Sequence, residues 1–223
     1  MLILNGSHAE IPLIMAAREL GYEVITTGVH QSSNGHSYGD TYIHADYSDI
    51  NSITEIASSH NVCGIVSGCN DFGAITAASV SQILGLPGHD DPSTCLALHH
   101  KDQFRTLLGQ LGLPSIKSVL ISESDSDLCA IDRLEMPIIV KPIDLSGGKG
   151  MTICTDAREI QPAIAFAIAA SRASHVVVEQ FLEGTHHGFT GFITDGRVLW
   201  WFADDEQYSV NPFLVAGTSA PTS

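Results

Sequence analysis

Residues 136–151 read Met-Pro-Ile-Ile-Val-Lys-Pro-Ile-Asp-Leu-Ser-Gly-Gly-Lys-Gly-Met, and this stretch does most to decide the fold. Apolar runs predict a strand over 137–142 that carries Lys141 and a second strand over 151–155. The glycines of 146–150 let backbone N–H groups crowd around an anion, and a lysine among them adds positive charge. A P-loop is excluded, because a strand and not a helix follows the glycines. The pattern favours a phosphate-binding loop between two strands, with a plain glycine hairpin as the alternative.

A second cluster places a carboxylate at the end of an apolar strand: Val176-Val-Val-Glu-Gln-Phe-Leu-Glu-Gly184. A strand end beside an apolar wall suits a flat purine. Backbone groups can form hydrogen bonds with the edge of the purine, and Glu179 or Gln180 can pair with its amino group. The alternative is an edge strand that runs into a loop.

A third cluster begins with Lys101, at the start of an amphipathic helix predicted over 101–111. A cation at a helix N-terminus opposes the helix dipole, which prefers anions there. A phosphate bound near Lys101 would remove that conflict. The alternative is a solvated lysine.

The rest of the chain divides into two patterns. In the first part, predicted strands at 1–5, 22–27 and 62–67 alternate with predicted helices at 9–20, 51–58 and 72–84. This alternation predicts an α/β domain with a doubly wound parallel sheet. The later part is α+β and mostly antiparallel, with a hairpin of 188–193 and 197–202 through the turn dipeptide Asp195-Gly196.

Composition excludes several classes of protein. The 223 residues carry 10 basic and 25 acidic side chains, a formal net charge of −15, which disfavours nucleic acid and anionic membranes as partners. The five cysteines are irregularly spaced and predict neither disulfides nor a zinc site. No segment reads as a signal peptide or a membrane span, so we expect a cytoplasmic location.

Polar residues also follow two strands of the first part: Asn5 and His8 after the first, and Asp71 after the third. Doubly wound sheets bind ligands at the carboxyl ends of their strands. These residues are candidates for contact with an acceptor substrate, and helix capping or turn formation is the alternative.

The three clusters, in their order along the chain, resemble the ATP-grasp ligases, in the branch of carbamoyl-phosphate synthase and phosphoribosylamine-glycine ligase. The set comprises Lys101, Val-Lys-Pro at 140–142, Ser-Gly-Gly-Lys-Gly at 146–150 and Glu-Gln-Phe-Leu at 179–182. The resemblance covers nearly the whole chain as the N-terminal portion of such a ligase. It implies a Rossmann-like pre-ATP-grasp domain over 1–90, a helical linker over 91–118, a lid over 119–184 and the incomplete start of the C-terminal ATP-grasp sheet over 185–223.

The resemblance also implies roles for particular residues. Lys101 and Lys141 would contact the phosphates of ATP and serve the catalysis. A flap over the triphosphate would comprise Ser146, Gly147, Gly148, Lys149 and Gly150. Glu179 would meet the adenine amino group, and the backbone of Gln180, Phe181 and Leu182 the purine edge. The position at which the family often has a ribose-binding glutamate holds His186 here, followed by His187.

The resemblance implies a ligase that uses ATP and Mg²⁺ to join a small carboxylate to an amine or similar nucleophile through an acyl phosphate. The family's metal-binding acidic residue and Glu-x-Asn pair are not found after Trp201, so we expect the magnesium ligands beyond residue 223. We therefore expect either a fragment of a longer chain or a naturally short protein, inactive as a ligase by itself, with a glycine loop that is mobile or disordered. Asp204, Asp205 and Glu206 read as a solvated turn, and the polar residues 216–223 predict nothing that seals the preceding sheet.

Two other functions stay open: a non-catalytic nucleotide-binding or regulatory module of ATP-grasp origin, and a doubly wound domain that binds a nicotinamide or sugar nucleotide at Gly6. The absence of a Gly-x-Gly-x-x-Gly fingerprint after the first strand argues against the second of these. The sequence fixes neither the identity of the substrates nor the oligomeric state, and a homodimer stays open.

Overall fold

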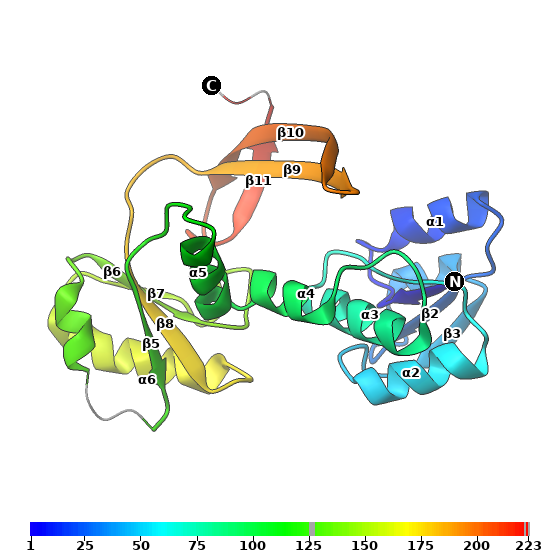
Figure 1. The fold of residues 1–223 in the computed structure, drawn as a ribbon, viewed down its shortest axis with the longest axis horizontal. Coiled ribbons are helices and arrows are strands. Elements are labelled where there is room, and N and C mark those ends of the chain that lie inside the picture. The colour runs from blue at the N-terminus through cyan, green and yellow to red at the C-terminus, as the bar shows by residue number, and fades with distance from the viewer. Residues whose placement is uncertain (125–127, 221, 223) are drawn as a thin grey trace. The chain divides into compact units, whose positions relative to one another are not determined.

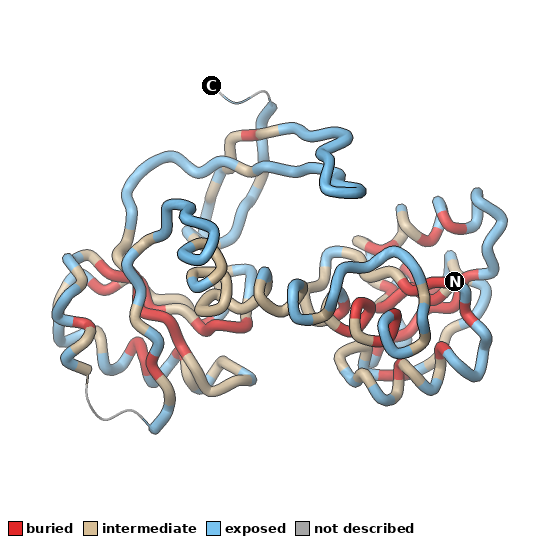
Figure 2. The backbone as a smooth tube through the Cα atoms, in the orientation of Figure 1, coloured by how far each residue is buried: buried red, intermediate tan, exposed pale blue. Residues whose placement is uncertain are grey.

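The computed structural model describes residues 1–124, 128–220 and 222, and the chain forms two compact units (Figure 1). The first unit is Met1–His99 and the second is His100–Ser223. Each unit contains its own buried core (Figure 2). The finer division into four parts stays a prediction. Within the described ranges, no helix has the length and apolar character needed to cross a membrane.

The first unit is built on a four-stranded sheet. Its strands run parallel in the order β3-β2-β1-β4 and comprise β1 (Leu2–Leu4), β2 (Ile25–Gly28), β3 (Thr41–His44) and β4 (Ile65–Ser67). The helical elements are α1 (Ile11–Glu19), η1 (Asn34–Tyr38), α2 (Ile50–Ser59), α3 (Asp71–Leu84) and α4 (Pro92–His99). The parallel sheet predicted from the alternating pattern is confirmed.

Strand β1 contributes to hydrophobic cores on both faces of this sheet. Ile3 packs with Ile14 and Ala17 of α1, whereas Leu2 and Leu4 pack with side chains of α2 and α3. Because successive strand residues point to opposite faces, helices must cover both sides of the sheet.

The second unit begins with helix α5 (Lys101–Gln110) and contains an antiparallel sheet. The sheet order is β5-β8-β6-β7, from β5 (Ser118–Ser122), β6 (Ile138–Pro142), β7 (Thr152–Cys154) and β8 (His175–Gln180). The remaining helical elements are η2 (Cys129–Arg133), η3 (Ala157–Glu159) and α6 (Ile160–Ala170). The strands predicted on either side of the glycine loop are therefore β6 and β7.

The two faces of this sheet have different surroundings. Val140 and Val178 belong to the core that α6 completes through Ala163, Ile164 and Ala167. Their neighbours along β6 and β8 alternate to the opposite face, so residues 139, 141, 177 and 179 lie away from α6. This second face carries the polar groups of the candidate site.

A separate three-stranded sheet completes the second unit. It comprises β9 (His187–Thr194), β10 (Arg197–Tyr208) and β11 (Val215–Ser219) in the order β11-β10-β9, all antiparallel. Asp195 and Gly196 connect β9 to β10 with φ angles of 49° and 71°. Positive φ at both positions is the geometry of a tight hairpin turn, and the predicted hairpin is confirmed.

Two expectations for this region are wrong. Asp204, Asp205 and Glu206 do not form a solvated turn, because β10 continues through them to Tyr208. The Asp205 carboxylate lies 2.7 Å from Nδ1 of His187, and the Glu206 carboxylate accepts a hydrogen bond from the Tyr208 hydroxyl.

The polar segment after residue 214 also pairs with the sheet. β11 forms a ladder with β10, in which Ser219 lies opposite Asp205. Backbone hydrogen bonds form this ladder without an apolar pattern, which is why the sequence of this segment gave no strand signal.

Most residues of the β9–β10 hairpin are exposed (Figure 2), and large apolar side chains are among them. Phe189 stacks on Trp201 on one face, and Phe192 lies beside Trp200 on the other. Trp200 is 51% exposed and Trp201 is 59% exposed. An apolar ribbon that is exposed on both faces is unusual for a soluble hairpin, which normally has one polar face.

We predict that Gly150→Ala destabilises the second unit more than Gly147→Ala. Both glycines have positive φ, 68° and 66°, which costs an L-residue about 1–2 kcal/mol. A Cβ at 150 would also lie 2.7 Å from Pro142 Cγ and 2.9 Å from Ala170 Cβ, which adds an overpacking cost of about 1–3 kcal/mol. A Cβ at 147 meets only Leu214 Cδ1, at 4.0 Å. Urea unfolding followed by circular dichroism measures both variants, and equal losses would contradict the packing argument.

Candidate functional site

A buried carboxylate lies at the centre of the second unit. Glu179 on β8 is fully buried, directly opposite Ile139 on β6. Arg105 of α5 donates to it from Nε at 2.7 Å and from Nη2 at 3.3 Å. Lys141 of β6 donates to the second carboxylate oxygen at 2.9 Å. Three elements distant in sequence are thus joined by one charged cluster, which we call the Glu179 cluster: Arg105, Lys141 and Glu179.

The two cations keep Glu179 ionised. Burial alone raises the pKa of this carboxyl group, because a low dielectric disfavours the charged form. The hydrogen bond from Arg105 and the charge of Lys141 outweigh burial, and the pKa of Glu179 falls below its ordinary value of 4.5. Near neutral pH Glu179 is therefore ionised, with both of its oxygens facing basic side chains.

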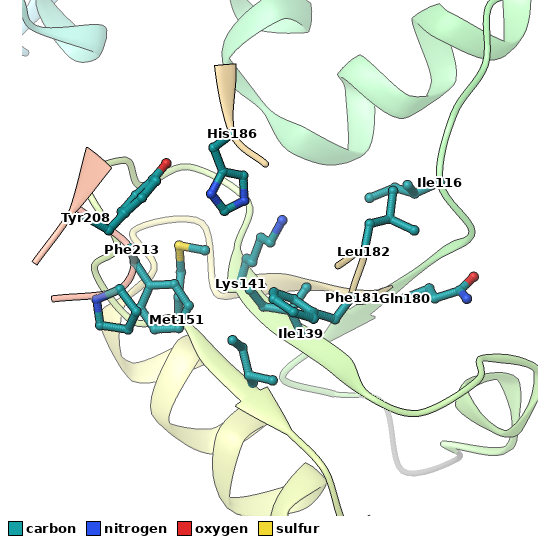
Figure 3. A pocket seen from close by; sticks show the side chains of 12 residues that line it. Ile116, Ile139, Lys141, Met151, Gln180, Phe181, Leu182, His186, Tyr208 and Phe213 are labelled. Atoms are coloured by element: carbon teal, nitrogen blue, oxygen red, sulfur yellow. The ribbon is translucent and has the colours of Figure 1, made fainter. Parts of the chain in front are cut away.

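Lys141 connects this cluster to a cavity of about 530 Å³ (Figure 3). The walls come from β6 and β7, from the end of β8 and the residues after it, from the end of β10 and the residues after it, and from single residues before β5 and β9. The lining residues are Ile116, Ile139, Lys141, Met151, Ile153, Gln180, Phe181, Leu182, His186, Tyr208, Pro212 and Phe213. A mostly apolar pocket with a few polar groups and this volume is typical of small-molecule sites.

Lys101 binds the segment that follows β6 and does not line the cavity. Its ammonium group donates to the Leu145 carbonyl at 2.6 Å, and its backbone N–H donates to the Ile143 carbonyl at 3.1 Å. The N-terminus of α5 is thereby attached to the start of the glycine loop. Contact of Lys101 with the phosphates of ATP stays a prediction.

The glycine loop, residues 146–150, is shaped by backbone conformation. Gly147, Gly148 and Gly150 have φ angles of 66°, 73° and 68°, which L-residues rarely adopt. A Cβ on Gly148 would lie 2.5 Å from the Cβ of Phe213, so Phe213 packs directly against the loop backbone. Mobility of this loop stays a prediction.

Asp144 anchors the chain just before the glycine loop. This carboxylate is 2% exposed and accepts hydrogen bonds from the Ser171 hydroxyl and from the backbone N–H groups of Arg172 and Ala173, at 2.8–3.0 Å. All of these partners lie between α6 and β8. Asp144 is thus a structural carboxylate that fixes where the loop begins.

His186 lies at one end of the cavity, beside Tyr208. Their rings meet edge to face with centroids 4.9 Å apart, and the Tyr208 hydroxyl donates to Glu206 at 2.6 Å. The hydrogen bond to Glu206 raises the pKa of Tyr208 to about 12. The phenol therefore stays protonated at neutral pH, with its hydroxyl hydrogen-bonded to Glu206.

Arg105 is the member of the Glu179 cluster to which sequence reasoning assigned no role. It lies four positions after Lys101 on α5, one helical turn away, so both side chains share a face of the helix. That spacing was the available signal. Its partner Glu179 is 74 positions away, a distance at which local patterns carry no information.

In the first unit, the polar candidates lie where the parallel strands end. Asn5 has a φ of 75° and bridges to Thr27, His8 is exposed, and Asp71 lies 3.8 Å from His99. Contact of these residues with an acceptor substrate stays a prediction.

Two buried residues at the same edge were not foreseen. Glu10 is 1% exposed and accepts from the Ser7 backbone at 2.8 Å and from the Ser7 hydroxyl at 2.7 Å. His36 lies with Nδ1 at 2.9 Å from Thr26 Oγ1. Burial lowers the pKa of His36, so this imidazole is neutral at physiological pH.

Comparison with known proteins relates part of the chain to a family of ATP-binding domains. Residues 100–197 match the family described as carbamoyl-phosphate synthase L chain, ATP binding domain. The formate-dependent phosphoribosylglycinamide formyltransferase of Burkholderia mallei (strain SAVP1) is 25% identical over 189 residues, covering 82% of this chain and 46% of that protein. The chain therefore spans about half the length of the curated relatives it matches.

Solved structures share the fold over nearly the whole chain. Phosphoribosylglycinamide synthetase from Anaerococcus prevotii superposes with a TM-score of 0.71 at 20% identity, covering 99% of this chain and 55% of that one. N5-carboxyaminoimidazole synthetase from Staphylococcus aureus, complexed with ADP, gives a TM-score of 0.76 at 16% identity, covering 93% of this chain and 54% of that one.

The Glu179 cluster predicts a pH dependence of stability. A carboxyl group with a lowered folded-state pKa stabilises the fold above its ordinary value of 4.5, and this contribution is lost as the pH falls through the folded value. We expect wild-type protein to lose stability below about pH 4.5 more steeply than Glu179→Gln, which cannot titrate at this position. Near pH 7 the variant should be less stable by roughly 3 kcal/mol. Urea unfolding across pH measures both effects, and parallel pH profiles would contradict the assignment.

Tyr208 gives a spectroscopic prediction. In a difference titration of phenolate absorbance between wild type and Tyr208→Phe, the missing tyrosine should ionise at about 12. Glu206→Gln should return this midpoint toward 10, because it removes the carboxylate that holds the proton. A wild-type midpoint already at 10 would show that the hydrogen bond to Glu206 does not form in solution.

Proposed function

Because this chain belongs to the ATP-grasp family, as an N-terminal portion of ligases about twice its length, we propose that its cavity beside β6 and β8 binds ATP. The observation that carries the proposal is the position of Lys141, which lines an apolar cavity next to a glycine loop held by Lys101. An apolar slot suits adenine, and a cation beside backbone N–H groups suits the phosphates. In support, the Staphylococcus aureus neighbour is complexed with ADP.

The proposed contacts follow the walls of the cavity. Adenine would lie among the apolar side chains of Ile139, Ile153 and Leu182. The backbone N–H groups of Gln180 and Phe181 already donate to the Lys117 and Pro137 carbonyls, at 3.3 and 2.9 Å. We therefore propose that the polar edge of the purine forms hydrogen bonds with the backbone carbonyls of this segment and with the backbone N–H of Leu182.

Glu179 has a different proposed role from the one that resemblance implies. Both of its oxygens accept hydrogen bonds from cations, and its side chain is fully buried. We propose that it holds Lys141 at the wall of the cavity until a phosphate binds, and that backbone carbonyls meet the adenine amino group. Lys149 and the N–H groups of the glycine loop would close over the triphosphate, and His186 with Tyr208 would face the ribose.

For the whole protein we propose an ATP-dependent ligase. The carboxylate oxygen of one substrate attacks the γ-phosphorus of ATP, ADP leaves, and an acyl phosphate forms. The nitrogen of an amine, or a similar nucleophile, then attacks the acyl carbon, and inorganic phosphate leaves as the amide-like bond forms. The residues described above contribute by positioning and by neutralising phosphate charge, without a covalent enzyme intermediate.

Magnesium has no site that the described residues supply by themselves. Across positions 1–124, 128–220 and 222, no three His, Cys, Asp or Glu side chains are grouped so that they could hold a metal ion. The carboxylate of Glu179 accepts hydrogen bonds from Arg105 and Lys141. The carboxylate of Asp144 accepts hydrogen bonds from Ser171 and from backbone N–H groups.

We predict that the chain binds ATP and that Lys141→Met weakens binding by roughly tenfold to a hundredfold, the effect of losing one charge-assisted hydrogen bond. Isothermal titration calorimetry measures the dissociation constants. Lys117→Met is the matched control, since Lys117 lies outside the cavity, and it should bind ATP as wild type does. Absence of ATP binding by the wild-type chain, or an equal loss in the control, would contradict the proposed function.

A further inference from the structure

The two cations of the Glu179 cluster differ in how they are held. Arg105 makes two hydrogen bonds to Glu179, at 2.7 and 3.3 Å, from a helix that packs beside the sheet. Lys141 makes one, at 2.9 Å, and its side chain lines the cavity (Figure 3). A planar guanidinium suits a fixed fork, whereas an ammonium on a flexible stem reorients at little cost. Arg105 is therefore the fixed partner and Lys141 the movable one.

Binding of a phosphate by Lys141 changes the charge balance around Glu179. When the ammonium turns toward an anion in the cavity, Glu179 loses one of its two cations while staying buried. A buried carboxylate without any partner is strongly disfavoured. With Arg105 in place, Glu179 keeps a bidentate ion pair throughout, and the lysine is released at low cost.

We propose that Arg105 is a positioning residue of the nucleotide site, the permanent counter-ion that frees Lys141 to exchange from Glu179 to a bound phosphate. This inference rests on the ATP site proposed above and deepens it. Without Arg105, Lys141 is the remaining cation on a buried carboxylate and is retained there. Arg105 thus controls the affinity of the cavity for polyphosphate without touching the nucleotide.

The exchange has a consequence that separates it from a merely structural role. Only ligands that carry phosphate draw Lys141 away from Glu179. Loss of Arg105 should therefore weaken the binding of ATP and leave the binding of adenosine nearly unchanged. Removing the charge of Glu179 in the same chain should reverse the defect, because Lys141 no longer has a buried carboxylate to hold it.

The experiment compares dissociation constants for ATP and adenosine by isothermal titration calorimetry. For Arg105→Met we expect ATP binding at least about tenfold weaker and adenosine binding within about threefold of wild type. Arg105→Lys, which keeps the charge, should recover most of the loss. The double variant Arg105→Met with Glu179→Gln should bind ATP more tightly than Arg105→Met alone.

Arg158→Met is the matched control. Arg158 also pairs with a carboxylate in the second unit, Asp156, but its side chain is 90% exposed, and its loss should leave both affinities unchanged. Circular dichroism establishes that each variant is folded, and Arg105→Gln replaces Arg105→Met if the latter does not fold.

The outcomes distinguish this inference from the proposed function. A wild-type chain that binds no ATP overturns the proposed function. Wild-type ATP binding with equal losses of ATP and adenosine in the Arg105 variant overturns the counter-ion role alone. The counter-ion role is also overturned if the double variant Arg105→Met with Glu179→Gln binds ATP no more tightly than Arg105→Met alone.

Discussion

The need to neutralise a carboxylate that has no contact with solvent governs the architecture of the second unit. Glu179 is fully buried on β8, and its charge is balanced by Arg105 from α5 and Lys141 from β6. Those two ion pairs attach the helix that precedes the sheet to the two strands at its centre. The contact between Lys101 and the Leu145 carbonyl adds a second attachment at the N-terminus of the same helix.

This arrangement explains why the apolar cavity has a cation at one wall. Val140 and Val178 face the core beneath α6, so their neighbours Lys141 and Glu179 must face the other way. A charge on that face can persist only when paired, and the pairing positions it at the cavity. Packing on one side of the sheet therefore determines the chemistry on the other.

Local patterns predicted most of the elements and part of the site. Alternating apolar runs predicted the parallel sheet, and Asp195-Gly196 predicted the hairpin, because turn chemistry and periodicity act over a few residues. Lys141 and the glycine loop were recognisable for the same reason.

Contacts between distant segments were not predictable in this way. The pairing of Arg105 with Glu179 and the burial of Glu10 and His36 depend on tertiary packing. The extension of β10 through Asp204–Glu206 and the pairing of β11 depend on backbone hydrogen bonds. The residue types in these segments do not indicate a strand. The roles of individual site residues toward a nucleotide remain predictions.

The apolar β9–β10 hairpin also determines which part of this protein intrinsic tryptophan fluorescence can monitor. Both tryptophans of the chain, Trp200 and Trp201, lie on adjacent positions of β10 and point to opposite faces of the ribbon. Neither belongs to a described hydrophobic core of either unit. Tryptophan fluorescence of this chain therefore reports on both faces of the hairpin. Its emission wavelength should shift when another molecule or segment covers either face.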